Sequence, residues 1–432
     1  MKMPNSVDKR RMKYVATIND ESLSEATEPE YELQYIDIGN VDSYGTIHDI
    51  VSYKFENAPS RARRIVRDGD IIISTVRTYL QAIAPIEKPP ENLIVSTGFA
   101  VVRPDRQIFD ARFCKYAVRE KRFLWEVESR STGVSYPAIN ASDLADIKIG
   151  FPDLETQRLI ADYLDRETAR IDALVAEKET MLALLEEKRS ALISQAVTRG
   201  LDPDAPLKPS GLDWLGDIPA HWFVLKLKYV VSKIGSGVTP RGGAESYQSE
   251  GIPLFRSQNI HFDGLRMDDI VYIDPETHDS MSNSMVLNGD IMLNITGASI
   301  GRCYYIEGMQ EEANVNQHVC IVRPSSQIDT KFLYFELRSE IGQHQIDLSQ
   351  SGSGREGLNF ESLGNFYIIV PPQTEQSEIV DYLEKSGQRS ELLLSEIHKS
   401  IERLKERRAA LITAAVTGAV PVEEMRGCPG LY

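Results

Sequence analysis

Two long stretches of the chain carry apolar residues at coiled-coil spacing. Residues 154–197 contain no Pro or Gly, and the main apolar positions follow one another at intervals of 4, 7, 3, 7, 4 and 7. A second stretch near the C-terminus has a similar pattern, with Ser390 at one seam position. Such spacing predicts two long α-helices, each with a hydrophobic seam. The predicted seam residues are Ile160, Leu164, Ile171, Leu174, Met181, Leu185 and Leu192 in the first helix, and Ile379, Leu383, Leu393, Ile397, Leu404 and Leu411 in the second.

Proline and glycine mark the ends of both predicted helices. Pro152 and the pair Pro371-Pro372 precede them, and Gly200 and Gly418 stand where C-terminal caps belong. A helix of about 44 residues is about 65 Å long. Because neither stretch has another long apolar partner in the chain, we expect the two helices to pair as an antiparallel coiled coil.

The second helix repeats the sequence of the first. The phrase "EKRSALISQAVT" (187–198) returns as "ERRAALITAAVT" (406–417), so that Glu187 aligns with Glu406 and most positions are identical. Upstream, "GDIIIS" from Gly69 matches "GDIMLN" from Gly289. The chain is therefore two copies of one unit, which predicts an internal pseudo-twofold repeat.

The segments outside the helices contain short β-like runs separated by turns, such as "DIIIST" and "LIVSTGFAVVRP" in the first copy and "DIMLNI" and "HVCIVRP" in the second. The predicted fold class is α+β, with two tandem domains of mixed α/β content separated and followed by the long helices. We place the first domain at residues 1–150 and its helix at 151–200. A linker and the second domain follow at 201–370, then the second helix at 371–420 and a C-terminal tail at 421–432.

Composition and charge narrow the class of protein. The chain has 432 residues, of which 42% are hydrophobic and 26% charged, as in soluble globular proteins of more than one domain. The net charge of −16, taken over the whole chain, argues against binding of nucleic acid. However, residues 1–150 carry 21 basic and 22 acidic residues, and residues 54–77 carry six basic and three acidic ones. A local basic patch therefore survives in the first domain.

The sequence shows no motif of catalysis. It lacks a GxxxxGK[ST] phosphate loop, a GxGxxG fingerprint, an HExxH pair and the Asn-Pro-Pro-aromatic tetrapeptide of adenine methyltransferases. His318 and Cys320 are too weak a pair to predict a metal site. The four cysteines show no CxxC pairing, and no apolar run is long enough to span a bilayer, which favours a cytoplasmic protein with reduced thiols. We therefore expect a binding protein with no catalytic residues, no metal and no cofactor of its own.

Several phrases, in this order and duplicated, resemble the specificity (S) subunit of type I restriction-modification enzymes over essentially the whole chain. They are "APSRARRIVRDGDIIISTVRTYL" (58–80), "STGFAVVRP" (96–104), "GVSYPAINASDL" (133–144), "KPSGLDWLGDIPAHW" (208–222), "GSGVTPRGG" (235–243), "NVNQHVCIVRP" (314–324) and "SGSGREGLNFESL" (351–363). In one respect the copies differ. The second copy has the lead-in "SGLDWLGDIPAHW" and the first lacks it, so the first domain is either shortened there or completed by the closing tail.

The resemblance implies a non-catalytic subunit whose two target recognition domains each read one half of a bipartite, asymmetric site on double-stranded DNA. It implies that the helices dock two methyltransferase (modification) subunits, which hold S-adenosylmethionine, and that motor-nuclease (restriction) subunits complete the complex. Two alternatives stay open. One is a duplicated coiled-coil adaptor that does not bind specific DNA sequences, and the other is a nuclease or methyltransferase with an unrecognised site.

Candidate DNA contacts in the first domain combine basic, aromatic and hydroxyl side chains. Arginine can contact phosphates and also guanine edges, and loops with hydroxyls and a glycine can approach the DNA backbone closely. The alternative for the arginines is a solvated loop with ion pairs to Asp68 and Asp70. The candidates are Arg61, Arg63, Arg64, Arg67, Arg77, Tyr79, Ser131, Thr132, Ser135 and Tyr136.

Candidates in the second domain include amide side chains, which suit adenine edges. The alternative for "NVNQHV" is structural, with its amides bonded to the backbone inside the domain. The candidates are Thr239, Arg241, Arg256, Ser257, Gln258, Asn259, Arg302, Asn316, Gln317, His318, Ser353 and Arg355. For docking of partner subunits we select the outer faces of the repeated helical phrases, with Arg189, Gln195, Arg199, Arg408 and Thr413.

Overall fold

The computed structural model describes residues 8–350 and 357–426. Two compact units divide the chain: the first unit holds residues 1–179 and 398–432, and the second unit holds residues 180–397. Each unit therefore takes one half of each long helix, and the first unit also takes the C-terminal tail.

The first unit is built on two four-stranded sheets and a separate two-stranded ribbon. One sheet has the order β2-β9-β6-β7 and is antiparallel, and the other has the order β4-β3-β8-β5, in which β3 and β8 are parallel. The strands are β1 (Asp8–Arg11), β2 (Ala16–Ile18), β3 (Glu32–Ile36), β4 (Val51–Lys54), β5 (Ala62–Ile65), β6 (Ile71–Ser74), β7 (Ile83–Pro85), β8 (Leu93–Ser96), β9 (Phe99–Pro104) and β10 (Lys148–Phe151). The helices are α1 (Ala111–Ala117), α2 (Lys121–Arg130), α3 (Ala141–Ala145) and α4 (Leu154–Arg199).

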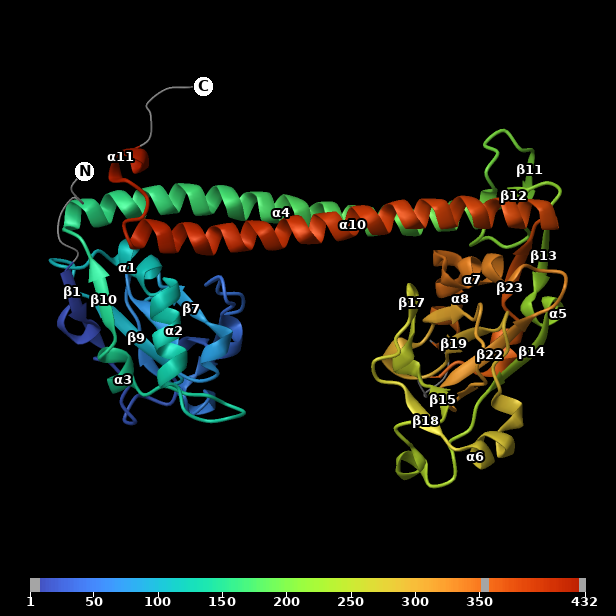
Figure 1. The fold of residues 1–432 in the computed structure, drawn as a ribbon, viewed down its shortest axis with the longest axis horizontal. Coiled ribbons are helices and arrows are strands. Elements are labelled where there is room, and N and C mark those ends of the chain that lie inside the picture. Colours follow the sequence, from blue (N-terminus) through green and yellow to red (C-terminus); the bar gives the residue numbers. More distant parts are fainter. Residues whose placement is uncertain (1–7, 351–356, 427–432) are drawn as a thin grey trace. The chain divides into compact units, whose positions relative to one another are not determined.

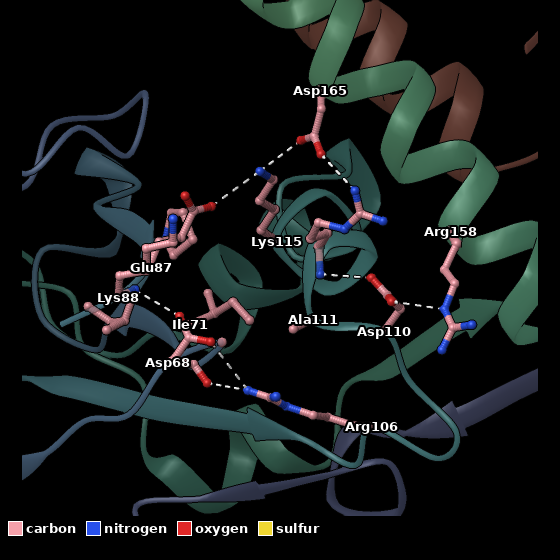
Figure 2. A pocket seen from close by; sticks show the side chains of 14 residues that line it. Asp68, Ile71, Glu87, Lys88, Arg106, Asp110, Ala111, Lys115, Arg158 and Asp165 are labelled. Atoms are coloured by element: carbon pink, nitrogen blue, oxygen red, sulfur yellow. Dashed lines mark hydrogen bonds and ion pairs between the residues drawn. The ribbon is translucent and has the colours of Figure 1, made fainter.

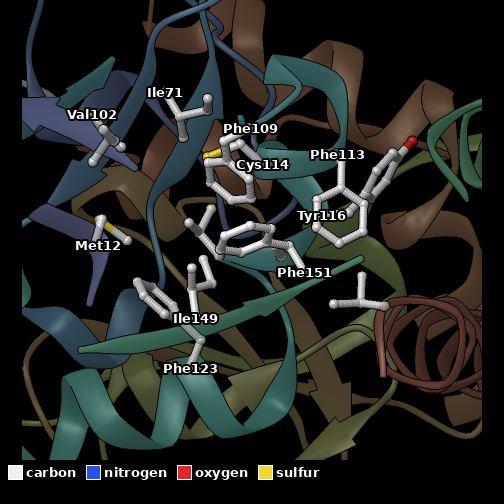
Figure 3. Packing of buried hydrophobic residues seen from close by; sticks show 14 of the residues in the cluster. Met12, Ile71, Val102, Phe109, Phe113, Cys114, Tyr116, Phe123, Ile149 and Phe151 are labelled. Carbon is white, nitrogen blue, oxygen red and sulfur yellow. The ribbon is translucent and has the colours of Figure 1, made fainter. Parts of the chain in front are cut away.

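The main core of the first unit lies between the β2-β9-β6-β7 sheet, the short helices and the long helices. Aromatic side chains dominate it: Phe109 and Phe113 meet edge to face with ring centroids 5.9 Å apart (Figure 3). The cluster also includes Ile160 from α4 and Ile412 from the second long helix. Burial of these rings anchors the sheet to the helix pair.

The second unit repeats the central sheet. Its β14-β22-β19-β20 order matches β2-β9-β6-β7, and a parallel pair, β15 with β21, matches β3 with β8. The strands are β11 (Leu207–Pro209), β12 (Asp217–Pro219), β13 (Phe223–Lys226), β14 (Val231–Ser236), β15 (Ile252–Phe255), β16 (Ile260–His261), β17 (Gly264–Leu265), β18 (Val271–Ile273), β19 (Ile291–Asn294), β20 (Cys303–Tyr305), β21 (Asn314–Val315), β22 (Val319–Pro324) and β23 (Tyr367–Val370). The helices are α5 (Leu227–Val230), α6 (Pro275–Ser280), α7 (Thr330–Arg338), α8 (Glu340–Gln350), α9 (Phe360–Gly364) and α10 (Gln373–Val416), and α11 (Val422–Met425) belongs to the tail.

The long helices α4 and α10 pack antiparallel within each unit (Figure 1). In the first unit Arg408 donates to Asp172 over 2.8 Å, and in the second Arg189 lies 3.7 Å from Glu391. The two ion pairs are equivalent, because the alignment of the repeated helices also matches Asp172 with Glu391 and Arg189 with Arg408. The predicted antiparallel pairing of the helices is confirmed, and the repeat extends to its register.

The prediction was wrong for three seam residues. Leu174 and Met181 are 40% and 50% exposed, and Leu393 is 53% exposed. The less exposed seam positions are instead Ile171, Val175, Lys178, Leu182, Leu185 and Arg189 in α4 and Ser390, Leu394, Ile397, Ile401, Leu404 and Arg408 in α10. These alternate strictly by four and three positions, which keeps one face toward the partner helix. Each misplaced residue has an apolar neighbour one position later, so hydrophobicity alone did not choose between them.

The C-terminal tail completes the first unit. Met425 is buried in the same core cluster as Ile160, and Val420 packs against that cluster. In the second unit the start of α10 is covered by Trp222, whose indole N–H donates to Glu375 over 2.9 Å. The tail therefore lies at the start of α4, as the lead-in segment lies at the start of α10.

Glu336 of α7 is a buried carboxyl in the core of the second unit. One of its oxygens accepts from the backbone N–H of Ile369, and the other has no hydrogen-bond partner among the described residues. Burial raises the pKa of Glu336 well above its usual value. The folded protein therefore holds a proton that the unfolded chain releases above about pH 4.5.

We expect Glu336→Gln to be more stable than the wild type at pH 7–8 and to flatten the dependence of stability on pH. Because the folded pKa is raised, wild-type stability falls as pH rises from the unfolded pKa to the folded one, by at most about 1.4 kcal/mol per pH unit. Chemical denaturation between pH 4 and 8 measures this slope. Equal slopes for the variant and the wild type would contradict the assignment.

Candidate nucleic-acid interface

Two loops of the first unit meet to form one surface feature, which we name the first tip: residues 75–81 after β6 and residues 131–138 after α2. The N–H of Thr78 donates to the carbonyl of Pro137 over 3.3 Å, and the N–H of Ile139 donates to Thr75 over 2.9 Å. The hydroxyls of Thr78 and Ser131 lie 2.8 Å apart. These bonds hold together two loops that are far apart in the sequence.

The first tip presents aromatic and basic side chains to solvent. Tyr79 and Tyr136 are 54% and 62% exposed, and Val134 on the second of the two loops is fully exposed. The guanidinium of Arg77 lies 4.9 Å from the ring centroid of Tyr136. Thr132 and Ser135 are exposed on the same loop as Tyr136. Guanidinium, hydroxyl and aromatic groups of this kind can contact phosphates, base edges and base faces.

The second unit has an equivalent second tip, formed by residues 295–301 with Gly357 and Leu358. Thr296 forms an isolated β-bridge with Gly357, as Val76 does with Ala138 in the first tip. The N–H of Leu358 donates to Ile295 over 2.8 Å, as Ile139 does to Thr75. The predicted contacts Ser353 and Arg355 lie outside the described residues. The framework of the tip is thus common to both units, and its side chains differ.

Polar side chains gather beside the second tip. His318 lies 2.6 Å from the hydroxyl of Thr296 and 2.9 Å from the amide nitrogen of Gln317. Asn316 is almost fully buried, and its side chain accepts from the N–H of His318 over 3.1 Å. Asn316 therefore has the structural role that was the alternative for this segment, with its amide bonded to the backbone. The side chains of Gln317 and His318 stay partly exposed.

Other predicted contacts of the second unit divide into structural and exposed groups. Asn259 is fully buried, accepts from the N–H of Arg256 and donates to Arg266, so it holds a turn together. Arg256 donates to the carbonyl of Asp269 over 2.6 Å and lies over the ring of Tyr247. The side chains that keep exposure are Thr239, Arg241 and Gln258, and those with partial exposure are Ser257 and Arg302.

Gly237 joins the exposed loop at Thr239 and Arg241 to the polar group beside the second tip. A Cβ built on Gly237 would lie 1.7 Å from the carbonyl oxygen of Val315 and 2.8 Å from that of Asn316. Only glycine permits this close approach. Gly237 therefore holds the start of this loop against residues 315–316, and His318 links them to Thr296 of the second tip.

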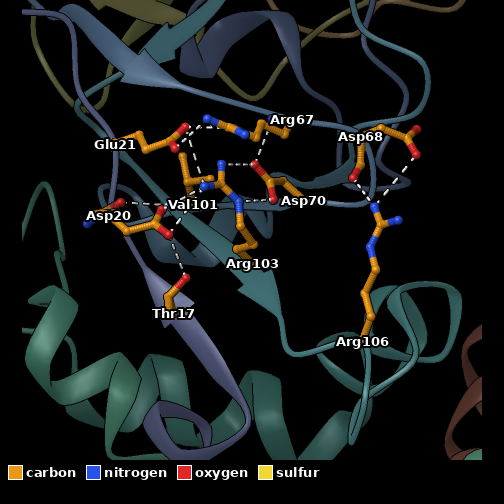
Figure 4. Close-up of polar contacts among 10 residues, drawn as sticks. Thr17, Asp20, Glu21, Arg67, Asp68, Asp70, Val101, Arg103 and Arg106 are labelled. Atoms are coloured by element: carbon orange, nitrogen blue, oxygen red, sulfur yellow. Dashed lines mark hydrogen bonds and ion pairs between the residues drawn. The ribbon is translucent and has the colours of Figure 1, made fainter.

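The basic cluster of the first unit consists of Arg61, Arg63, Arg64 and Arg67. Its side chains make more contacts within the unit than the sequence predicts. Arg67 makes two hydrogen bonds to Glu21, of 2.8 and 2.6 Å (Figure 4). The alternative for this cluster was ion pairing with Asp68 and Asp70, but Arg103 pairs with Asp70 and Arg106 pairs with Asp68. Glu21 and Arg67 are distant in the sequence, and nothing in the local sequence shows their pairing.

The remaining arginines of the cluster lie on or beside strand β5. Arg63 lies 4.7 Å from the ring centroid of Phe55 and donates to the carbonyl of Ala62. Arg64 is half-buried, and its Nε has no partner among the described residues. Arg61 is exposed. The register of β5 against β8 shifts between Ala62 and Arg64, so the directions of these side chains do not follow the simple alternation of a regular strand.

A basic ribbon that the sequence analysis did not select lies at β1 and β10. The side chains of Lys9, Arg10, Arg11 and Lys148 are exposed there, and Lys13 follows directly. Lys13 lies 2.8 Å from Asp146, and Arg10 lies 2.6 Å from Asp8. The basic run "DKRRMKY" (8–14) was the feature of the sequence that could have identified this ribbon.

A hollow of about 530 Å³ in the first unit is lined by several charged side chains that pair with one another. Lys115 bridges Asp165 and Glu87 over 2.8 and 3.5 Å (Figure 2). Arg158 lies 3.6 Å from Asp110 at its edge. These pairs hold α1 to α4, and we assign the hollow a structural role.

The predicted docking residues occupy different places on the helices. The side chains of Arg189 and Arg408 are only 15% exposed and form the interhelical ion pairs. The hydroxyl of Thr413 accepts from the N–H of Lys121 over 3.3 Å. Gln195 and Arg199 are exposed. In addition, apolar residues that face solvent were missed as surface residues by the sequence analysis: Leu174, Met181, Leu184, Leu392 and Leu393.

Two kinds of feature are absent from the part of the chain that the structure describes. No group of three or more His, Cys, Asp or Glu residues suited to a metal ion occurs there. No helix there is both long and apolar enough to cross a bilayer.

Comparisons with known proteins identify a family with this architecture. The family model described as "Type I restriction modification DNA specificity domain" matches residues 4–182 and again residues 219–403. The EcoBI specificity subunit of Escherichia coli is 25% identical over 414 residues, covering 89% of this chain and 86% of that protein. The MjaVIII specificity subunit of Methanocaldococcus jannaschii is 23% identical, covering 77% of this chain and 75% of that protein.

A solved chain, reported in work on complex assembly and conformational transition of the type I R-M system, has the same fold. It superposes with a TM-score of 0.74 over 97% of this chain and 100% of that chain, at 22% identity. With the family model matched once in each half, this chain belongs to the type I restriction-modification DNA specificity family and carries two of its domains.

Proposed function

We propose that each unit reads one half of a bipartite, asymmetric DNA site through its tip and the surface beside it. The observation that carries this proposal is the recurrence of one loop framework with different side chains. The first tip shows Arg77, Tyr79 and Tyr136, whereas the second shows Gly297 and lies beside Gln317 and His318. A constant framework with variable side chains suits two units that read different base sequences on the same kind of backbone.

The chemistry of the two surfaces divides into positioning and base recognition. Exposed cations such as Arg61 and Arg241 are suited to phosphates, which are the same in every sequence. Hydrogen-bonding side chains at the tips, such as Arg77 and Gln317, are suited to base edges. No catalytic role is assigned to any residue of this chain.

We further propose that the helices dock two methyltransferase subunits, one for each copy of the repeated surface. Solvent-facing apolar residues on the helices, Leu184 and Leu392 among them, would be buried by a protein partner. Gln195 and Arg199 lie in or beside the repeated phrase of the second unit, and Thr413 lies in that of the first unit. Because the chain is a pseudo-twofold repeat, two copies of one partner can bind in equivalent ways.

The partner methyltransferase would hold S-adenosylmethionine, and motor-nuclease subunits would add cleavage. We place the assembly in the cytoplasm, in keeping with Cys114, Cys303 and Cys320, which are free and buried. The adaptor alternative is disfavoured by the family match in both halves of the chain.

Selection from random DNA duplexes tests the proposal. The chain, in complex with its methyltransferase partner, should select two short conserved segments separated by a gap of fixed length. Turnover of DNA by the purified chain alone, or an absence of any selected sequence, would contradict it.

We expect exchange of residues 16–150 for the same segment of another family member to change one selected segment only. The other segment should stay the same, because the second tip and its surroundings belong to the second unit. Mapping of methylated sites in cells measures both segments at once. A change in both would mean that the units do not read DNA separately.

A further inference from the structure

The backbone of the first tip is strained at Arg77. Its φ and ψ are 51° and 50°, the left-handed region, where a side chain carrying Cβ is disfavoured. Gln81, at the other end of the same short turn, has φ 51° as well. Strain of this kind persists only where the surrounding structure enforces it, and it is concentrated at functional sites.

In the second unit, glycines occupy the two positions that are equivalent to Arg77 and Gln81. In the alignment that matches Gly69 with Gly289, Arg77 aligns with Gly297 and Gln81 aligns with Gly301. The φ values of these two glycines are 72° and 88°. Both positions of the second tip are therefore glycine, the residue that this conformation favours. The first tip holds side chains at both positions despite their conformational cost.

The two glycines of the second tip have different surroundings. A Cβ on Gly301 would lie 2.5 Å from the side-chain oxygen of Gln343, so a side chain there would displace that amide. Gly297 is exposed, and no heavy atom of the described residues would lie within 4 Å of a Cβ built on it. Position 77/297 is thus open to solvent in the second unit, and a side chain at this position of the tip can reach a ligand.

Arg77 and Gln81 also differ in what their side chains do. The amide of Gln81 donates to Glu128 over 3.1 Å, which is a structural bond within the unit. Arg77 has no carboxylate partner among the described residues, and its guanidinium lies over the exposed ring of Tyr136. Arg67, by contrast, is held by Glu21. Arg77 therefore keeps all its donors for a ligand while its direction is fixed by stacking.

We propose that Arg77 is a specificity-determining residue of the first unit, which donates a pair of hydrogen bonds to O6 and N7 of a guanine in the first half-site. The inference rests on the proposed function of the tips. A phosphate contact would serve both half-sites equally and would be expected in both units. The residue instead changes between the units, as the recognised bases do, and paired donation to guanine is the commonest specific contact of arginine.

The test compares Arg77→Gly, Arg77→Lys and the control Gln81→Gly in complex with the methyltransferase partner. Thermal unfolding and selection from random duplexes are measured for each. Arg77→Gly should unfold at the same temperature as the wild type or higher, because strain is relieved. It should lose preference for guanine at one position of the first half-site by about 5- to 150-fold, with the second half-site unchanged.

The other two variants separate charge and strain from base recognition. Arg77→Lys keeps the charge but not the planar fork, so it should lose most of the guanine preference while keeping the salt dependence of binding. Gln81→Gly relieves the neighbouring strained position, and it should leave every base preference unchanged.

Three outcomes would overturn the inference. Equal loss of affinity for all sequences with a salt slope lower by about one unit would make Arg77 a phosphate contact. An unchanged preference at every position would show that it touches no base. Lower unfolding temperature with both half-sites altered would make its role structural. A wild-type complex that selects no sequence at all would instead reject the proposed function of the tips.

Discussion

Asp290→Ala should abolish recognition of the second half-site and spare the first, and Asp70→Ala should do the reverse. Asp290 is fully buried and accepts two hydrogen bonds from Arg323, of 2.6 and 2.8 Å. Asp70 is buried and accepts two from Arg103, both of 2.8 Å. The pairs are equivalent under the repeat, because the alignment of Gly69 with Gly289 continues through both partners, so the two variants are matched.

Each pair ties together two strands and a turn of the central sheet. Asp290 also accepts from the N–H of Leu287, and Asp70 accepts from the N–H of Arg67, so each aspartate closes the turn before β19 or β6. The tips follow directly after these strands. Hydrogen bonding to Asp70 raises the pKa of Arg103. Because arginine is charged in proteins even without such a partner, Asp70→Ala leaves the cation in place.

The expected loss of stability is about 3 kcal/mol for Asp290→Ala, the lower end of the range for broken buried pairs. The lower end applies because the side chain of Arg323 is 28% exposed and is partly hydrated after the change. The loss should be smaller for Asp70→Ala, because Arg103 keeps Asp20 and Glu21 at 3.1 and 3.4 Å. Thermal or chemical unfolding gives the loss, and selection from random duplexes in the complex gives the effect on each half-site.

Asp263→Ala is the control for removal of a carboxylate. Asp263 lies 2.7 Å from Arg266 on the surface of the second unit, with both side chains about half exposed. An exposed pair of this kind contributes less than about 1 kcal/mol. If Asp290→Ala were as mild as this control, or if it impaired both half-sites equally, the units would not fold and read as we describe.

The long helices were predictable from the sequence because their signal is local. Freedom from Pro and Gly over residues 154–197 and a repeated apolar spacing define a helix without knowledge of its surroundings. The assignment of Leu174 rather than Val175 to the seam failed for the same reason. Both are apolar, and only the position of the partner helix distinguishes them.

The sequence patterns predicted where the strands of the central sheets lie along the chain, but not which strands pair with one another. The run "LIVSTGFAVVRP" contains two strands, β8 and β9, because Thr97 and Gly98 form a turn between them. These strands belong to different sheets, β8 beside the parallel β3 and β9 beside β6. Such long-range pairing is a tertiary property that composition does not encode locally.

The candidate contacts show the same division. Exposure of Arg77 and Tyr136 on one tip depends on two loops far apart in the chain, which the sequence presents separately as a basic and a hydroxyl-rich segment. Asn259 satisfied the chemical criterion for adenine recognition, yet both functional atoms of its amide are used inside the turn. Residue type identified the candidates, and only the fold distinguishes free donors from committed ones.

Removal of one heptad from each long helix should shorten the gap between the two half-sites and leave both half-site sequences unchanged. The helices are continuous over Leu154–Arg199 and Gln373–Val416, and the ion pairs fix their register. The spacing from Asp172 to Arg189 along α4 equals the spacing from Arg408 back to Glu391 along α10. Position 172 faces 408 and 189 faces 391, so residues 177–183 face residues 397–403.

The paired deletion removes residues 177–183 and 397–403 together. It keeps the seam on one side of each helix, because a heptad makes almost two full turns, and it shortens each helix by about 10 Å. That length corresponds to about three base pairs of duplex DNA. If the helix pair sets the distance between the recognition units, the gap should shorten by about one to three base pairs.

Deletion of a shorter segment from each helix, 177–181 with 399–403, is the control. This deletion rotates the following segment by about 140°, which turns the seam away from the partner helix. The control variant should lose stability and should not bind the bipartite site. Genome-wide mapping of methylated sites reports the gap for the heptad variant and the loss of methylation for the control. If the heptad variant is folded and still methylates the original site with its original gap, the helices do not set the spacing and their role is to dock partner subunits.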